Sequence, residues 1–177
     1  MTLAHVVPVL AVAVAVCAAI SDVKERRVPN RLTYSAIVAG LILQATLHGW
    51  KGLMFSAGGT LLFGGVFMLF YLVRTMGAGD VKLAGALGSI VGSSATVPVM
   101  FATALAGGAL AIWFMVLSGR TAETLRNTLS VVGFHLRHGL QVHQVVNLDN
   151  PTAVPMPYGL AFAVGTLYWA VFLGGWR

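Results

Sequence analysis

Long apolar runs are the feature of this sequence that most constrains its fold. Of 177 residues, 58% are hydrophobic and only 9% are charged, whereas about a quarter of the residues in a soluble domain are charged. A helix needs about 20 apolar residues to cross a bilayer, and barrel strands are much shorter. Because only helices and closed barrels satisfy backbone polar groups in lipid, these runs predict an all-α, polytopic membrane bundle.

Six apolar runs are candidates for transmembrane helices. They cover residues 3–21, 32–48, 53–73, 81–94, 96–117 and 158–176. The fourth run is short and breaks near Gly92. Most connections are a few residues long, so we expect the helices to pack as antiparallel neighbours within a single membrane-embedded domain, residues 1–177.

The long connection, residues 118–157, contains a stretch near 121–146 with the pattern of an interfacial amphipathic helix. Apolar residues recur there at spacings of three and four, with arginines and histidines elsewhere on the helical wheel. The apolar set is Leu125, Leu129, Val132, Leu136 and Leu140. His135, His138 and His143 lie nearby, but no carboxylate at helical spacing completes a metal site, so no metal is expected.

The distribution of basic residues predicts the orientation in the membrane. Cytoplasmic loops carry the excess of Lys and Arg. With the N-terminus outside, nine of the eleven bases fall on the inner side, and only Lys51 and Arg177 fall on the outer side. The first basic cluster follows residues 1–20 instead of preceding them, so we expect a retained first span and no signal peptide. Bases clustered between apolar runs are topology signals and do not indicate a nucleic-acid partner.

Asp22 lies at the inner end of the first predicted span, in a segment that continues through a basic run to Val28-Pro29-Asn30. A carboxylate at a helix C-terminus opposes the helix dipole, so helix stabilisation does not explain it. The alternative is a solvated charge neutralised by its basic neighbours. Asn30 is expected to be the N-cap of the second span.

Asp80 follows two glycines in Gly77-Ala78-Gly79-Asp80. Asp is a favoured N-cap and would suit the start of the fourth predicted helix. A cap does not require the two glycines, however. Gly77 and Gly79 remove side chains beside the carboxylate and would let an extended substrate backbone lie against it, so both are candidate substrate-binding residues.

Topology brings the two aspartates together. Two predicted spans separate Asp22 from Asp80, and an even number of spans returns the chain to the same membrane face. Two neighbouring carboxylates share one proton and can position a water, one acting as general base and the other as general acid. This is the chemistry of aspartyl proteolysis, and ionisable groups near hydrocarbon are functional candidates by default.

Other intramembrane protease classes fit less well. A zinc protease would need His-Glu-x-x-His, which the chain lacks. A serine protease would need a basic partner, but the serines at positions 89, 93 and 94 lie at the opposite end of the fourth span from the histidines of the long connection. The single cysteine, Cys17, excludes a disulfide framework and a cysteine-based zinc site.

Three sequence elements, in order along the chain, resemble the type IV prepilin peptidases. The segment Gly77-Ala78-Gly79-Asp80-Val81-Lys82-Leu83 matches their Gly-x-Gly-Asp signature. Asp22 with its basic run resembles the first aspartate motif, and Pro155-Met156-Pro157-Tyr158-Gly159 resembles the start of the last span. The resemblance implies cleavage of the basic leader of prepilin or pseudopilin precursors at the cytoplasmic face of the plasma membrane, by Asp22 and Asp80 and without a cofactor.

The resemblance is to the short members of the family. Longer, bifunctional members carry an additional region with paired cysteines and also methylate the new N-terminus. This chain has one Cys and starts at the core, so peptidase activity without methyltransferase activity is expected, as in tight-adherence pilus systems or archaeal preflagellin processing. Lys82, two residues after Asp80, either meets an acidic substrate residue beside the scissile bond or extends to the membrane interface.

Two other functions remain open from the residues alone. A small transporter or scaffold could use Asp22 and Asp80 as a proton relay or in ion pairs. A signal-peptide-peptidase-like protease could apply the same Gly-x-Gly-Asp chemistry to unrelated membrane helices. Loss of proton flux would identify the first, and substrate profiling would identify the second.

Overall fold

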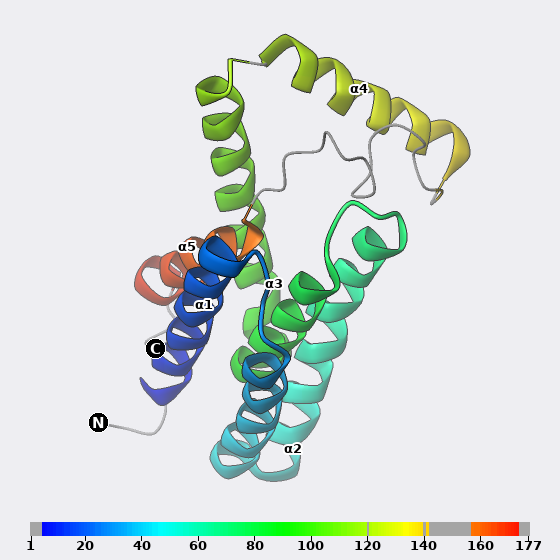
Figure 1. The fold of residues 1–177 in the computed structure, drawn as a ribbon. Helices are drawn as coiled ribbons and strands as arrows, with labels where there is room; N and C mark the ends of the chain where they lie inside the picture. The colour runs from blue at the N-terminus through cyan, green and yellow to red at the C-terminus, as the bar shows by residue number, and fades with distance from the viewer. Residues whose placement is uncertain (1–4, 120, 140, 142–156, 174–177) are drawn as a thin grey trace.

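The computed structural model describes residues 5–119, 121–139, 141 and 157–173, and its regular structure there is helical (Figure 1). The helices are α1 (Val6–Glu25), α2 (Asn30–Leu72), α3 (Ala78–Leu117), α4 (Thr121–His138) and α5 (Tyr158–Phe172). The first three are long and apolar enough to cross a membrane, and α5 is apolar but shorter. The predicted all-α membrane bundle is confirmed.

The predicted number of transmembrane helices is wrong. We expected six plus an interfacial helix, whereas the described residues form five helices in all. The difference arises because α2 and α3 each contain two of the predicted runs and one non-helical glycine. Gly49 has φ 60° and ψ −141°, and Gly92 has φ 73° and ψ 166°. Glycine adopts such angles without the steric cost of a Cβ, so the chain reverses at one residue instead of through a longer loop.

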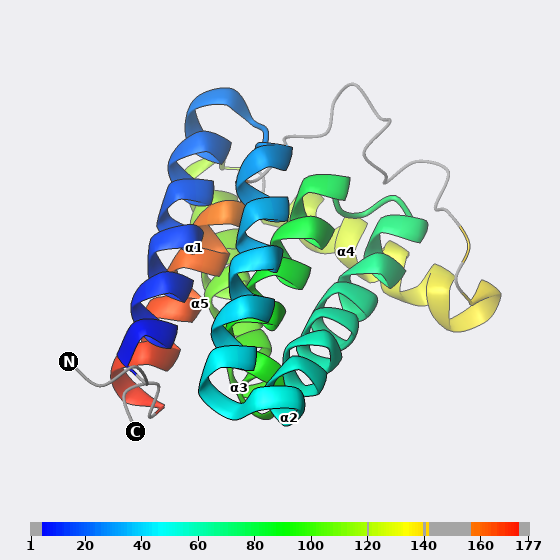
Figure 2. The same ribbon diagram turned by 90° about the horizontal axis from the view of Figure 1, so that it is seen from below.

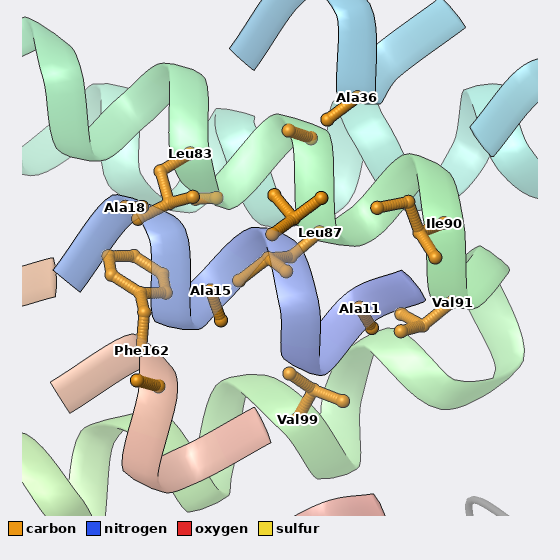
Figure 3. Close-up of a cluster of buried hydrophobic side chains, with 14 of the residues drawn as sticks. Ala11, Ala15, Ala18, Ala36, Leu83, Leu87, Ile90, Val91, Val99 and Phe162 are labelled. Carbon is orange, nitrogen blue, oxygen red and sulfur yellow. The ribbon is translucent and has the colours of Figure 1, made fainter. Parts of the chain in front are cut away.

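The two reversals set the arrangement of the bundle. The halves of α2 on either side of Gly49 lie side by side and run in opposite directions (Figures 1 and 2). In α3, Val91 lies at the reversal and Val99 lies on the returning segment (Figure 3). The first half of α3 packs closely on the second half of α2, where a Cβ on Gly59 or on Gly88 would overlap the other's carbonyl. Such contacts between small residues are typical of helix packing in membranes.

A buried polar network stabilises the reversal at Gly92. The break deprives the preceding carbonyls of their helical N–H partners, which is costly in an apolar interior. Side chains of α2 replace those donors: Gln44 Nε2 donates to the carbonyl of Ile90 at 2.7 Å, and Ser56 Oγ donates to the carbonyl of Ser89 at 2.8 Å. The side chains of α2 therefore stabilise the end of the first half of α3.

An alanine-rich face of α1 packs into the core. Ala11, Ala15 and Ala18 are buried in the same hydrophobic cluster as Leu87 of α3 and Phe162 of α5 (Figure 3). Their spacing of four and three residues places them on one side of the helix. Since Asp22 follows Ala18 by about one turn, this packing fixes the end of α1 beside the starts of α3 and α5.

Helix α4 lies away from the bundle core (Figure 1). It begins within the stretch predicted to be amphipathic and ends at His138; Leu140 and His143 lie outside the described residues. The other four residues of the predicted apolar set are exposed on it: Leu125, Leu129, Val132 and Leu136. That α4 rests on the membrane surface stays a prediction.

Replacing Gln44 with Leu should destabilise the protein, because the buried carbonyl of Ile90 would lose its donor. Unsatisfied buried acceptors cost about 1–3 kcal/mol, and interhelical hydrogen bonds in membranes average about 0.6 kcal/mol. We therefore expect the free energy of unfolding in detergent micelles to fall by about 1 kcal/mol.

Thr46→Val is the matched control for this prediction. Thr46 Oγ1 donates at 2.7 Å to the carbonyl of Leu43 in its own helix, so its loss should change the free energy of unfolding by less than about 0.5 kcal/mol. Equal stability of the Gln44→Leu and Thr46→Val proteins would contradict the proposed role of Gln44.

Candidate active site

The fold places Asp22 and Asp80 at the same end of the bundle. Asp22 lies in the last turn of α1 and Asp80 in the first turn of α3. The helix between them, α2, reverses at Gly49, so the α1–α2 and α2–α3 connections lie at one end (Figure 2). The two carboxylates are close enough to interact electrostatically. The juxtaposition expected from two intervening spans is therefore produced by one helix that folds back.

Asp80 is held by the backbone at the start of α3. Its side chain is 9% exposed, and its Oδ2 accepts the N–H of Gly77 at 3.2 Å. Gly77 is the N-cap and Asp80 is the third residue of the helix, so the alternative in which Asp80 itself is the N-cap is wrong. The bond is the carboxylate half of a capping box, and it fixes the rotamer of Asp80.

Asp22 is held by the start of α5. Its Oδ2 accepts the N–H of Gly159 at 2.8 Å. This N–H belongs to the first turn of α5, where backbone donors lack helical partners and the helix dipole is positive. A Cβ on Gly159 would lie 2.9 Å from Cβ of Asp22 and 3.1 Å from Cα of Ala19. Only a residue without a side chain permits this approach of α5 to α1.

Tyr158 lies near the second carboxylate. Its ring is half-buried, and it interacts electrostatically with Asp80. The first two residues of α5 thus lie beside both aspartates, Gly159 at Asp22 and Tyr158 at Asp80. Sequence reasoning did not assign either residue to the site. The available signal was the motif at the start of the last span, whose Pro155 and Met156 lie outside the described residues.

The other candidate site residues, Gly77, Gly79 and Lys82, make different contacts at the start of α3. Gly77 adjoins the Asp80 carboxylate, and a Cβ on Gly79 would lie 3.4 Å from Cβ of Val28 in the α1–α2 connection. Lys82 Nζ donates to Asn30 Oδ1 at 2.8 Å and lies 5.5 Å from the ring centroid of Tyr34. Lys82 therefore links the starts of α2 and α3.

The predicted N-cap role of Asn30 is wrong. Pro29 occupies the N-cap position of α2, and Asn30 is the first residue of the helix. Its side-chain oxygen is used instead as the acceptor for Lys82.

A model of the type IV leader peptidase family matches residues 9–112, which is more than half of the chain and includes both aspartates. The chain belongs to the type IV leader peptidase family. No curated protein and no solved structure matches. The protein is therefore a membrane-embedded peptidase, and the start of α5 adds to its two-aspartate region from outside the matched segment.

The residues described by the structure include no group of three or more His, Cys, Asp or Glu side chains placed to hold a metal ion. The side chain of His135 and all of His143 lie outside them. The chemistry that the arrangement supports best is proton transfer between two carboxyl groups and a water.

Gly159→Ala should impair this leader peptidase, because the new Cβ would displace either the Asp22 carboxylate or the start of α5. A displacement of about 1 Å at a catalytic group can lower the rate about 100-fold. We expect a loss of at least about tenfold in the rate of leader cleavage, measured on purified enzyme with a leader-bearing precursor.

Gly108→Ala is the matched control, since a Cβ there would meet nothing within 4 Å. It should cleave at the wild-type rate. A Gly159→Ala enzyme with unchanged cleavage and an unchanged melting temperature would show that the contact between α5 and α1 is not needed for activity.

Proposed function

We propose that this protein is an aspartic endopeptidase that removes the leader of type IV prepilins or prepilin-like precursors, with Asp22 and Asp80 as its catalytic pair. The observation that carries the proposal is the convergence of the two carboxylates from α1 and α3 at one end of an apolar bundle. Membership of the leader peptidase family supplies the class of substrate.

The arrangement supports a mechanism through an attacking water. Two adjacent carboxyl groups hold one proton between them, because both cannot ionise easily at short range. The ionised group takes a proton from the water as its oxygen attacks the peptide carbon, and the protonated group gives its proton to the carbonyl oxygen. The C–N bond then breaks as the amine nitrogen takes the proton of one carboxyl group. At the same time the other carboxylate takes a proton from a hydroxyl of the tetrahedral intermediate, so the new carboxyl group forms and the pair again holds one proton. The proton belongs to the pair as a unit.

Backbone contacts preorganise this chemistry. The N–H of Gly159 holds Asp22, and the N–H of Gly77 holds Asp80, so neither carboxylate must be ordered when the substrate arrives. Asp80 is buried and Asp22 is partly exposed, which gives water access from the side of Asp22.

The distribution of charge supports cleavage at the cytoplasmic face. The basic residues of the α1–α2 connection, Arg74 and Lys82 lie at the same end of the bundle as the aspartates. Excess positive charge faces the cytoplasm in membrane proteins, so the active site is proposed to open there, in the plasma membrane and with the N-terminus outside.

Asp22→Asn and Asp80→Asn should each abolish cleavage of a co-expressed prepilin-like precursor, because neither variant retains a pair that can exchange a proton. Losses of at least about 1,000-fold are expected when a group essential to proton transfer is removed. Processing is read as the shift in precursor mobility, and membrane insertion of all three proteins is compared first.

Undiminished cleavage by either variant would remove that aspartate from the mechanism. If wild-type protein failed to cleave prepilin-like precursors but cleaved other membrane helices, a signal-peptide-peptidase-like function would replace the proposed prepilin peptidase function. Proton flux that is lost with the acids, in the absence of any cleavage, would favour the transporter alternative.

Lys82 is proposed to select substrates with an acidic residue beside the scissile bond. Lys82→Ala should lower kcat/KM for an acidic precursor about tenfold relative to a neutral one, since about 1.4 kcal/mol is tenfold in binding. The comparison uses two precursors that differ at that one residue.

Asn30→Ala is the control for a purely structural role of Lys82, because it removes the 2.8 Å hydrogen bond but keeps the charge. It should retain the preference for the acidic precursor. An unchanged acidic-to-neutral ratio in Lys82→Ala would contradict the proposal and leave Lys82 as a link between α2 and α3.

A further inference from the structure

A groove lies on the surface of the bundle between α1 and α5, and the catalytic mechanism does not use it. Its volume is about 370 Å³. The lining residues are Val16, Ala19, Ile20, Val23 and Lys24 of α1 with Leu160 and Ala163 of α5. Apart from Lys24, every one of these side chains is apolar.

The groove has a floor of small residues and walls of branched ones. Ala19 and Ala163 are 6% and 8% exposed, whereas Ile20 and Val23 are 51% and 57% exposed. Small residues between larger ones let another helix approach closely, and such sites dominate helix packing in membranes. The segment from Val16 to Val23 extends about 10 Å along α1, or two helical turns, which suits one ridge of side chains on a second helix.

The groove borders the candidate active site. Ala19 on its floor is also the residue whose Cα would lie 3.1 Å from a Cβ on Gly159, and Gly159 holds the Asp22 carboxylate. Val23 in its wall directly follows Asp22, and Leu160 directly follows Gly159. A chain that continued beyond this end of the groove would therefore pass close to Asp22.

The geometry points to this groove as the docking site for the apolar helix that follows the leader of the substrate. The inference rests on the proposed function and adds the surface that positions the substrate. The occupant must lie in the same membrane as the enzyme, be apolar over at least two helical turns, and continue as polypeptide to the carboxylate. The acyl chain of a lipid lies in the membrane and is apolar, but it is not a polypeptide that continues to the carboxylate.

Photocrosslinking tests the occupant directly. A benzoylphenylalanine in place of Ile20 is compared with one in place of Ile42, which is 60% exposed on α2 and outside the groove. Both are introduced into the Asp80→Asn enzyme in proteoliposomes, with a precursor made of a basic leader and one apolar helix. We expect an adduct to the apolar helix of the precursor from position 20 and none from position 42. Equal precursor adducts, or lipid adducts alone at position 20, would overturn the inference.

Kinetics supply a second test with the same pair of positions. Ile20→Trp fills part of the groove and should raise KM for the precursor about tenfold with kcat nearly unchanged, the pattern of lost binding. Ile42→Trp should leave both constants at wild-type values. Equal kcat and KM values in the two variants would overturn the inference. If Ile20→Trp has a lowered melting temperature, Val16→Trp is used in its place.

The outcome is separable from that of the proposed function. If Asp22→Asn and Asp80→Asn abolish cleavage while Ile20→Trp behaves like Ile42→Trp, the groove inference fails and the aspartic mechanism stands. If the Asn variants still cleave, the mechanism fails whatever position 20 contacts.

Discussion

The reversal of α2 at Gly49 is the constraint on which the candidate site depends. A continuous helix of 43 residues would be about 65 Å long and would carry Asp22 and Asp80 to opposite ends of the molecule. One residue at φ 60° folds the helix back on itself and returns the chain to the end where it started. The reversal at Gly92 acts in the same way on α3, because it returns the chain toward α5. Both depend on glycine, since a Cβ disfavours these backbone angles.

The start of α5 completes what the reversals bring together. Two carboxyl groups that share one proton must be held at a fixed separation if the proton is to pass between them and a water. Gly159 fixes Asp22 from α5, and Gly77 fixes Asp80 from its own helix. The alanine face of α1 lets α3 and α5 approach from opposite sides, as the packing of Ala15 and Ala18 near Leu83 and Phe162 shows (Figure 3). Small residues in the core therefore determine how accurately the polar groups at its end are placed.

Much of this arrangement could be predicted from sequence, for physical reasons. Apolar length identified the helical runs, and the count of runs between Asp22 and Asp80 predicted their common face. The breaks between the predicted runs near Gly49 and Gly92 coincide with the two reversals, but the number of helices differs, because each reversal takes up one glycine and joins two predicted runs into one folded-back helix. The roles of Gly159 and Tyr158 could not be predicted. Gly159, whose N–H binds Asp22, lies 137 residues after it in the sequence. No sequence periodicity indicates a contact over that separation.

The position of the aspartate pair at the end of the bundle also explains how water can reach the site in a protein with an apolar core. Peptide cleavage consumes a water, and the core beneath the aspartates is formed by fully buried side chains such as Leu83 and Leu87. Water can therefore approach from the end of the bundle, on the side of the partly exposed Asp22. A helical substrate would hide its peptide bonds in internal hydrogen bonds, so cleavage requires extended backbone at this point. An unwound substrate backbone can be hydrated at the lowest cost at the end of the membrane-spanning helices. Helix α1 itself ends there, with Arg26 in the left-handed conformation.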